Sequence, residues 1–410
     1  MSAAEPSPGE PIVVIGGGHA AAALCGALVE AGQGRRVSLV CAEPELPYHR
    51  PPLSKAYLKN PAEATTVHRA EAWYRQAGIR LFLGDAAVAI DRTARTVRLQ
   101  SGAVLPYGRL VLATGTRARR LAALADGLDN VVVLRSAADA LALRQRLPAT
   151  RRLTVLGGGF IGLEVAATAR GLGIDVQVLE AAPRLLMRSV SADIAEHVQQ
   201  QHLAAGIDLR LGVRVDGFEV DGARVVALRV DGVRQDVELL LLGIGAEPET
   251  ALAQEAGLMV DNGIVVDAQL HTSDPAILAI GDCARFPESS SGQVLRLESV
   301  QNANDQARTA AASLLGAPAA YRSLPWFWSE QGPMRLQMAG LMPADGERHR
   351  RPGANPSSFS ILHYRGGRLV CVESVNAPMD HLAARKLLEA GSNPSPALAC
   401  DPAVALKTLV

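Results

Sequence analysis

The chain has 410 residues, which is too long for one ordinary hydrophobic core and suits two or three domains. It carries 41 basic and 41 acidic residues, so its formal net charge is zero. No global electrostatic field therefore favours binding to nucleic acid or to an anionic membrane, and any charged docking site must be local.

The N-terminal segment and the cysteines bear on cellular location. The first ten residues contain no basic n-region, and the apolar run that follows is interrupted by glycines and a histidine. We therefore expect neither a signal peptide nor a membrane span. The five cysteines lie far apart and form no C-x-x-C pair, which indicates neither a zinc site nor a redox-active dithiol. Isolated thiols are typical of a reducing compartment, so we expect a cytoplasmic protein without a bound metal.

A duplicated pattern organises the first part of the chain. A short β-rich run leads into a glycine cluster and then a helix-forming stretch, once near residue 12 and again near residue 153. In each copy a second strand follows the helix, which is the βαβ pattern. Two copies predict two dinucleotides, one bound permanently and one exchanging. The alternative is that one copy is a structural repeat without a ligand.

The two glycine clusters differ in how closely they match the dinucleotide fingerprint. The first has Gly16 and Gly18, with Ala21 at the position where the helix packs closely on the strand. Alanine is small enough for that position. The second has the full pattern in Gly157, Gly159 and Gly162. In both, the glycines let the backbone approach a pyrophosphate, which the helix N-terminus holds with its N–H groups and partial positive charge.

Glu180 ends the strand that follows the second cluster, about 20 residues beyond it, as the fingerprint requires. Its carboxylate would accept hydrogen bonds from the adenosine ribose and repel a 2′-phosphate. This favours NADH over NADPH. Arg184 is an argument against this preference, because its side chain could swing toward such a phosphate.

Antiparallel strands are predicted beside each unit. Residues 213–245 contain runs of valine and leucine separated by Asp221-Gly222 and Asp231-Gly232, which are strong hairpin-turn dipeptides. We expect a meander that covers one side of the second sheet. Residues 86–115 have the same character. Residues 326–410 predict a separate α+β domain, with a polar basic loop around ERHRRPGANPSS, two later strands and a helix near DHLAARKLLEAG.

Seven segments occur in a fixed order: PYHRPPLSK (47–55), LVLATGT (110–116), GGGFIGLEVAATA (157–169), GIGAEP (243–248), TSDPAILAIGDCARF (272–286), ESVQNANDQA (298–307) and PWFWSEQ (325–331). Through them nearly the whole chain resembles the FAD-dependent pyridine-nucleotide oxidoreductases, and within them the ferredoxin reductases that serve bacterial oxygenases. The resemblance implies an α/β fold with two Rossmann-like dinucleotide-binding domains plus a C-terminal α+β domain. FAD would bind residues 1–117 and 247–325, NADH would bind 118–246, and 326–410 would form the third domain.

The resemblance also implies the cofactor contacts. Lys55 and Glu164 would pair near the flavin N5, where hydride arrives, and Trp328 would lie at the flavin face. From the residues alone, Glu164 could instead serve the dipole of its helix, and Trp328 could be core. The residues expected to contact FAD are Gly16, Gly18, Ala20, Glu43, Arg50, Lys55, Ala87, Thr114, Gly115, Arg135, Asp282, Val300 and Trp328. Those expected to contact NADH are Gly157, Gly159, Ile161, Gly162, Glu164, Glu180 and Gly245.

The chain departs from the family pattern at two positions. The acidic residue that commonly closes the second strand of the FAD unit is replaced by Ala42, with Glu43 one place later, so Glu43 is expected to take over the ribose contact. His19 stands where a leucine is more usual and could lie near the FAD pyrophosphate. A neutral imidazole is the expected state there.

The function implied by the resemblance is electron transfer from NADH through FAD to a small 2Fe-2S ferredoxin, which feeds an oxygenase, in a monomer or weak dimer. We hypothesise that Arg308, Arg348, Arg350 and Arg351 receive the acidic ferredoxin, although the last three could simply belong to a solvated loop.

The sequence also bears on other functions found in this superfamily. A disulfide reductase or a peroxidase needs a reactive cysteine beside the flavin, and Cys41 is better interpreted as a buried structural thiol. A rubredoxin reductase remains an alternative, because no short motif encodes the acceptor surface. A signalling flavoprotein of the apoptosis-inducing-factor type is disfavoured by the zero net charge.

Overall fold

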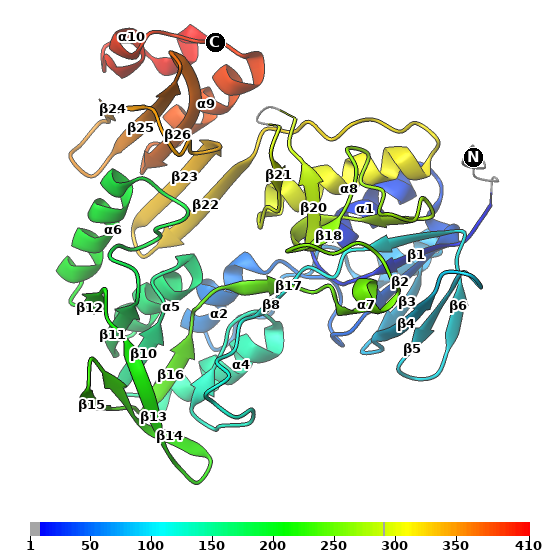
Figure 1. The fold of residues 1–410 in the computed structure, drawn as a ribbon, viewed down its shortest axis with the longest axis horizontal. Coiled ribbons are helices and arrows are strands. Elements are labelled where there is room, and N and C mark those ends of the chain that lie inside the picture. The colour runs from blue at the N-terminus through cyan, green and yellow to red at the C-terminus, as the bar shows by residue number, and fades with distance from the viewer. Residues whose placement is uncertain (1–8, 290–291) are drawn as a thin grey trace. The chain divides into compact units, whose positions relative to one another are not determined.

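The computed structural model describes residues 9–289 and 292–410 (Figure 1). The chain forms two compact units. Unit 1 consists of residues 1–50, 65–117 and 246–323, and unit 2 of residues 51–64, 118–245 and 324–410. Residues 51–64 therefore group with the second nucleotide-binding sheet, although they lie within the first part of the sequence. The division into three domains stays a prediction.

A five-stranded parallel sheet with the order β19-β7-β1-β2-β3 forms the centre of unit 1. Its strands are β1 (Ile12–Ile15), β2 (Val37–Cys41), β3 (Arg80–Leu83), β7 (Arg109–Leu112) and β19 (Ile277–Ala279). Every residue of β1 and β2 is buried, as expected for parallel strands covered on both faces. Two helices, α1 (His19–Glu30) and α8 (Val300–Leu314), pack against each other through alanine-rich faces.

Small antiparallel elements complete unit 1. The predicted meander is confirmed in β4 (Ala87–Asp91), β5 (Thr96–Leu99) and β6 (Val104–Pro106), whereas the last run of that stretch is β7 of the parallel sheet. The remaining elements are η1 (Gly34–Arg36), α3 (Glu71–Ala77), β8 (Thr116–Ala118), β17 (Ala246–Pro248), α7 (Ala251–Glu255), β18 (Ile264–Val265), η4 (Gly281–Cys283), β20 (Ala284–Pro287) and β21 (Val294–Leu295). The strands β8 and β17 pair where the chain leaves unit 1 and returns.

Unit 2 contains a second parallel sheet, with the order β12-β11-β10-β16-β9. Its strands are β9 (Val131–Val132), β10 (Arg152–Leu156), β11 (Asp175–Glu180), β12 (Asp208–Leu211) and β16 (Leu239–Leu242). Its helices are η2 (Pro51–Ser54), α2 (Ala56–Lys59), α4 (Ala137–Arg146), η3 (Leu147–Ala149), α5 (Phe160–Gly171) and α6 (Ala192–Ala204). The predicted fold class is confirmed, since each unit is built on a parallel nucleotide-binding sheet.

The second predicted meander is confirmed in β13 (Val215–Asp221), β14 (Arg224–Val230) and β15 (Val233–Asp236). The turn between β14 and β15 has positive φ at both Asp231 and Gly232, as a two-residue type I′ hairpin requires. Val225 and Leu228 of this meander pack against Leu240 of β16, so it covers one side of the parallel sheet. The sequence LLLL itself belongs to that sheet, because a run with no polar residue fits a strand buried on both faces.

The C-terminal part of unit 2 is an antiparallel sheet with the order β22-β23-β26-β25-β24. Its elements are β22 (Trp326–Gln331), β23 (Met334–Gly340), β24 (Glu347–Pro352), β25 (Phe359–Arg365), β26 (Arg368–Val375), α9 (Pro378–Ala390), α10 (Pro396–Cys400) and η5 (Leu406–Leu409). The predicted helix is α9. The predicted basic loop is wrong over residues 347–352, which form the strand β24 in place of a loop.

A solvated loop was predicted here, but the side chain of Arg351 is buried. The guanidinium donates hydrogen bonds to the carbonyl oxygens of Ala399, Asp401 and Val404 at 2.8 to 2.9 Å. It also pairs with Asp380 at 3.2 Å. Arg351 therefore ties the C-terminal segment to the sheet, and its predicted role in receiving a ferredoxin is wrong.

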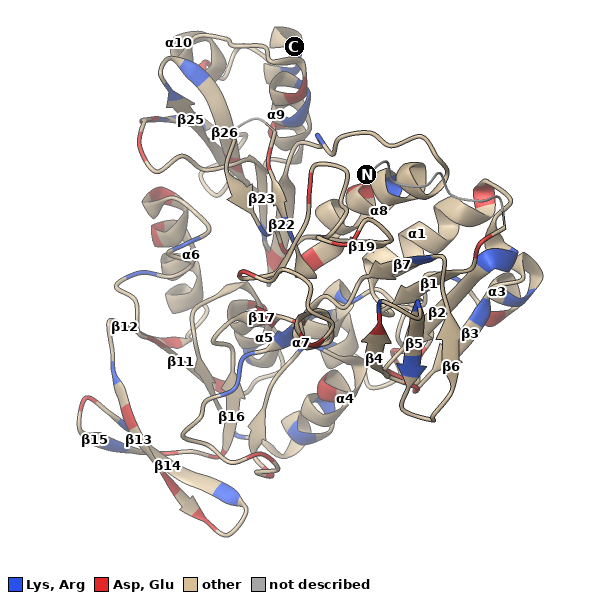
Figure 2. Ribbon diagram, turned by 45° about the vertical axis from the view of Figure 1, so that its right-hand side comes forward, with Lys and Arg blue, Asp and Glu red and all other residues tan. Residues whose placement is uncertain are grey.

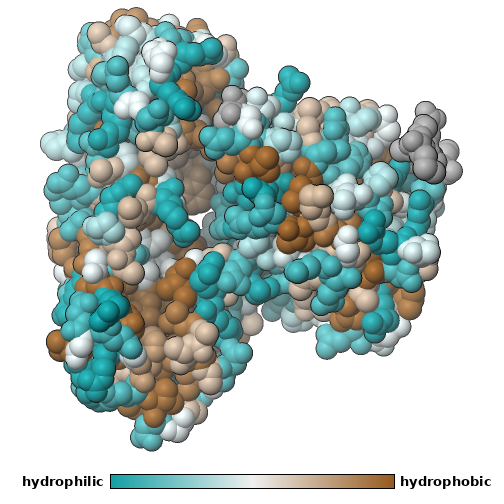
Figure 3. Space-filling model, in the orientation of Figure 1, coloured by the Kyte–Doolittle hydropathy of each residue, from teal (hydrophilic) through white to brown (hydrophobic). Residues whose placement is uncertain are grey.

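The surface carries no single-sign face in the views shown. Basic and acidic residues are interspersed along both units (Figure 2), which agrees with the zero net charge. On the face shown in Figure 3, hydrophobic residues gather in patches, most visibly over the lower part of unit 2, with hydrophilic residues around them. Across the described residues, no helix is both long and apolar enough to cross a membrane.

Replacing Arg351 should destabilise unit 2 strongly. In Arg351→Gln the carbonyl oxygens of Ala399, Asp401 and Val404 lose the guanidinium donor and Asp380 loses its cation, which should cost about 3 kcal/mol. The matched control is Arg348→Gln, because Arg348 is half-exposed and pairs with Asp193 at 2.9 Å, a contact worth about 1 kcal/mol or less. Urea unfolding followed by circular dichroism measures both, and equal losses in the two variants would contradict the assignment.

Candidate functional site

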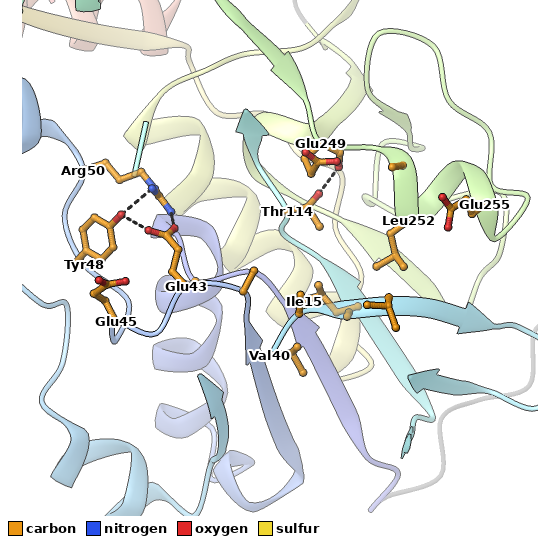
Figure 4. Close-up of a pocket in the computed structure, with 17 residues that line it drawn as sticks. Ile15, Val40, Glu43, Glu45, Tyr48, Arg50, Thr114, Glu249, Leu252 and Glu255 are labelled. Carbon is orange, nitrogen blue, oxygen red and sulfur yellow. Dashed lines mark hydrogen bonds and ion pairs between the residues drawn. The ribbon is translucent and has the colours of Figure 1, made fainter. Parts of the chain in front are cut away.

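A cavity of about 410 Å³ lies in unit 1, where β1, β2 and β7 end (Figure 4). The crevice at the carboxyl ends of the strands is where open α/β sheets bind ligands, and this volume is typical of a small-molecule site. Five residues expected to contact FAD line it: Gly16, Glu43, Arg50, Ala87 and Thr114. Other lining residues, which the motifs did not indicate, include Glu45, Tyr48, Glu249, Leu252 and Glu255.

The glycine loop after β1 is shaped by one close approach. Gly16 has φ +128°, and a Cβ atom there would overlap the carbonyl group of Ala113, so only glycine fits. Beside Gly18, in contrast, no atom of another segment lies within 4 Å of where a Cβ would be. The second glycine thus borders open space at the start of α1, where an anionic ligand can approach the backbone N–H groups.

Glu43, Tyr48 and Arg50 form a hydrogen-bonded cluster in the cavity wall (Figure 4). Tyr48 donates to Glu43 at 2.6 Å, and Arg50 pairs with the other carboxylate oxygen at 2.6 Å. Arg50 also donates to the Tyr48 hydroxyl at 2.9 Å. Burial, which acts to lower the pKa of Arg50, is outweighed by Tyr48, Glu43 and Asp282, so that pKa lies above its ordinary value. Arg50 therefore stays protonated in the cavity wall, where the Glu43 carboxylate balances its charge.

The opposite wall is joined to β7 by two hydrogen bonds. The hydroxyl of Thr114 donates to the carbonyl oxygen of Glu249 at 2.6 Å, and the Glu249 N–H donates to Gly115 at 2.9 Å. These bonds hold the segment that leads into α7 beside the glycine loop. Of Thr114 and Gly115, only Thr114 lines the cavity.

The remaining residues expected to contact FAD divide between the units. Gly18 and Ala20 lie at the start of α1, Asp282 lies in η4 directly after β19, and Val300 is the first residue of α8. All four belong to unit 1. Those that belong to unit 2 are Lys55, Arg135, which precedes α4, and Trp328 of β22.

The glycine loop of unit 2 has the same construction. Gly157 has φ +101°, and a Cβ there would overlap the carbonyl group of Gly243. A Cβ on Gly162 would overlap the carbonyl oxygen of Gly157, so the third glycine lets α5 pack on the loop. Gly159 is the N-cap of α5, as Gly18 is of α1, and neither helix has a capping side chain among the residues that the structure describes. Ile161, in the first turn of α5, is exposed.

Glu180 lies against this loop. Its carboxylate accepts hydrogen bonds from the backbone N–H groups of Gly158 at 2.5 Å and Ala182 at 2.6 Å. Arg184 donates to the carbonyl oxygens of Met187 and Val190 at 2.8 and 2.9 Å, so its guanidinium is held within its own loop. The acidic side chain therefore lies beside the second glycine loop while the neighbouring arginine is engaged by main-chain groups.

The predicted pair of Lys55 and Glu164 is present inside unit 2. Glu164 is buried on α5, and its carboxylate pairs with the Lys55 ammonium at 2.7 Å. Two serines that the motif analysis did not single out also donate to it, Ser54 at 2.5 Å and Ser329 at 2.7 Å. Both serines lie inside motif segments, PPLSK and PWFWSEQ, so these motifs could have indicated them. One cation and two hydroxyl donors thus satisfy the buried carboxylate.

The cysteines are structural. Burial raises the pKa of the Cys25 and Cys41 thiols to about 12, and it also raises the pKa values of Cys283, Cys371 and Cys400. Cys41 is buried at the end of β2, as predicted. A thiol in this state is a poor nucleophile.

Two parallel sheets, each with a glycine loop at the carboxyl ends of its strands, define an enzyme class that works with two dinucleotides. Residues 10–307 match the family described as pyridine nucleotide-disulphide oxidoreductase, and residues 326–410 match the family described as reductase C-terminal. The chain belongs to the pyridine nucleotide-disulphide oxidoreductases.

Within that family the chain is similar to reductases of oxygenase systems. It is 41% identical over 401 residues to rhodocoxin reductase of Rhodococcus erythropolis, covering 97% of this chain and 94% of the relative. It is 42% identical to the ferredoxin–NAD(+) reductase component of the anthranilate 1,2-dioxygenase system of Burkholderia cepacia, covering 98% and 99%. Among solved structures, the covalent putidaredoxin reductase–putidaredoxin complex superposes with a TM-score of 0.93 at 37% identity, covering 98% of both chains.

The thiol assignment has a direct test. At pH 8 a pKa near 12 leaves about one thiolate in 10,000 for Cys25 and Cys41. Burial also raises the pKa of the other two buried thiols, so all four should resist an aromatic disulfide reagent in the native protein. Only Cys400, which is half-buried, should react before unfolding, and all five should react in guanidinium. Rapid native labelling of Cys41, located by peptide mass spectrometry, would contradict the assignment.

Proposed function

We propose that this protein is an NADH-dependent ferredoxin reductase, which binds FAD in unit 1 and NADH in unit 2 and delivers single electrons to a 2Fe-2S ferredoxin of an oxygenase system. The observation that carries the proposal is the conjunction of two glycine-loop sheets with the buried Lys55–Glu164 pair, in a chain about 40% identical along nearly its whole length to reductases of such systems. FAD, when bound, accepts a hydride and gives up its two electrons one at a time.

The residues of the unit 1 cavity fit FAD. The open space beside Gly18 lets the backbone of the first turn of α1 approach a pyrophosphate. Glu43 lines the cavity, and its carboxylate, which accepts from Tyr48 and Arg50, is the acceptor that we propose for a ribose hydroxyl. Thr114 and Ala87 line the same cavity. These features support FAD as the permanently bound dinucleotide.

The residues of the unit 2 loop fit NADH. Gly157 and Gly159 provide the close backbone approach, and Gly245, with φ +105°, follows β16 at the same edge of the sheet. The Glu180 carboxylate lies at the loop, where it would accept from the adenosine ribose and repel a 2′-phosphate. Main-chain carbonyl oxygens engage Arg184, so its guanidinium is held within its own loop.

Lys55 and Glu164 act on the reaction through charge and position. The helix α5 begins at the glycine loop and carries Glu164 in its second turn, so the pyrophosphate site and the carboxylate share one rigid element. Ser54 and Ser329 fix both carboxylate oxygens, and the carboxylate fixes the Lys55 ammonium. The pair is neutral overall, which lets it orient dipoles near the reacting atoms without burying a net charge.

The acceptor side of the proposal depends on local charge. Arg308 is exposed on α8, where it pairs with Asp305, and Arg350 covers the ring of Phe359 at 3.7 Å. Together with Arg348, they are the basic residues that we propose to receive the ferredoxin, since Arg351 is buried. We also propose that the protein is a monomer or weak dimer. Its proposed location is the cytoplasm, where isolated buried thiols persist.

An anaerobic experiment tests the electron path. The FAD-loaded protein is reduced with NADH or NADPH, an oxidised 2Fe-2S ferredoxin is added, and bleaching of the ferredoxin's visible absorbance is followed. We expect fast bleaching with NADH. If NADH reduces the flavin while several such ferredoxins stay oxidised, the acceptor assignment is wrong, and rubredoxin or a signalling role takes its place.

The charge of Glu164 is tested by Glu164→Gln. This substitution keeps the shape but leaves the Lys55 ammonium without its carboxylate, so the rate of flavin reduction by NADH should fall about tenfold or more. The matched control is Glu196→Gln on α6, which makes the same chemical change at an exposed position. Stopped-flow absorbance measures both variants. An unchanged rate in Glu164→Gln with normal FAD content would show that the carboxylate is only structural.

The nucleotide preference is tested by Glu180→Ala. Loss of the ribose acceptor should raise the KM for NADH by about tenfold, since one or two hydrogen bonds to a charged group are lost. Removal of the repulsion should at the same time raise kcat/KM for NADPH. Steady-state kinetics with both nucleotides measures the shift, and an unaltered ratio of the two kcat/KM values would refute the role of Glu180.

A further inference from the structure

Three histidines meet in unit 1 although they are far apart in the sequence. His19 is the first residue of α1, His49 follows β2, and His68 precedes α3. The ring centroids are 3.9 Å apart for His49 and His68, 4.6 Å for His19 and His68, and 5.4 Å for His19 and His49. One ring nitrogen from each lies within 4.8 Å of the other two.

The backbone holds these side chains together. The N–H of His49 donates to the carbonyl oxygen of Thr66 at 2.8 Å, and the N–H of His68 donates to Pro47 at 2.8 Å. Between these bonds Tyr48 and Val67 form an isolated antiparallel bridge. His19 is fixed independently, because it is the first residue of α1 directly after the glycine loop. The main chain therefore brings His49 and His68 together, and the His19 ring lies against both from the start of α1.

The surroundings of His49 and His68 disfavour the protonated imidazole. Burial, His49 and nearby arginines lower the pKa of His68 to about 4, and burial and Arg69 lower that of His49. Within the described part of the chain, the buried Nε2 of His68 has no hydrogen-bond partner, which is a costly state for a polar atom. An imidazole nitrogen without a proton offers its lone pair to a metal.

We propose that His19, His49 and His68 bind one divalent transition-metal ion of the zinc type, with a fourth position left for water or another exchangeable ligand. Imidazole nitrogen is a preferred ligand of zinc, and three histidines plus water are a known tetrahedral set. Calcium and magnesium prefer oxygen ligands, so they fit these side chains poorly. Zinc binding here would be a property additional to the proposed ferredoxin reductase activity, and its measurement does not depend on that activity.

The geometry needs only a small closure. Zinc–nitrogen bonds of about 2.0 to 2.1 Å place tetrahedral ligand nitrogens about 3.3 Å apart. The widest separation among the three nitrogens is at most 4.8 Å, so the rings close by rotating their side chains while the paired backbone stays in place. A bound ion would then clamp the start of α1 to the segments around His49 and His68.

Nearby charge limits the affinity. Arg50 is neutralised by Glu43 at 2.6 Å, but Arg69, whose guanidinium lies 5.6 Å from the Trp73 ring centroid, remains a positive neighbour of His49 and His68. Its repulsion of a dication predicts that removing its charge strengthens binding. Arg69 thus provides a variant that should gain affinity, which a misfolded protein cannot imitate.

Zinc binding to the FAD-loaded protein provides the test. The protein is treated with a chelator, dialysed and titrated with ZnCl₂ by calorimetry. The wild-type protein should bind one Zn²⁺ per chain, and His49→Gln and His68→Gln should each weaken binding at least tenfold. His19→Leu should do the same, and Arg69→Gln should strengthen binding several-fold. His349→Gln on β24, outside the cluster, should bind zinc like the wild type.

A spectroscopic measurement distinguishes this site from adventitious binding. Co²⁺ in a tetrahedral three-histidine site gives visible ligand-field bands at longer wavelength than the flavin absorbance, and these bands should vanish in His68→Gln. The flavin spectrum of each variant reports that FAD is retained. If wild-type protein takes up no Zn²⁺ below millimolar concentration, or if His49→Gln and His68→Gln bind it as tightly as wild type, the proposal is wrong.

Discussion

The buried carboxylate of Glu164 connects three segments that are far apart in the sequence. Placing an ionised group in the interior costs several kcal/mol unless a cation and hydrogen-bond donors accompany it. Lys55 and Ser54 supply these from the segment after Arg50, and Ser329 supplies the other donor from β22. This requirement explains why residues 51–64 group with the second sheet, since their polar groups complete the environment of a helix in unit 2.

The two glycine loops share a steric constraint at their first glycine but differ at their third position and in their acidic residues. In both, the first glycine lies against the backbone of a neighbouring strand, and no other residue fits. The third position differs, because Gly162 lies directly on the carbonyl oxygen of Gly157 while Ala21 is accepted in unit 1. The acidic residues differ as well. Glu180 holds its own glycine loop, whereas Glu43 belongs to a cluster with Tyr48 and Arg50.

Long-range pairing also explains the errors in the sequence-based interpretation. Arg351 is hydrophilic and lies in a basic, proline-bearing stretch, which is typical of a solvated loop. Its buried position depends on carbonyl groups of Ala399, Asp401 and Val404, which come about fifty residues later and which no local pattern announces. The histidine cluster is hidden for the same reason, because His19, His49 and His68 match no short metal-binding spacing.

The sequence alone determined the two parallel sheets, their glycine loops, both meanders and the pairing of Lys55 with Glu164. These features follow from local patterns, such as buried apolar runs, turn dipeptides and glycine spacing, or from motifs of the family. Only the tertiary structure decided that β16 joins the parallel sheet, that Ser54 and Ser329 complete the Glu164 site, and that three distant histidines converge. Such contacts depend on which segments the folded chain brings side by side, and that information is not contained in any short stretch of sequence.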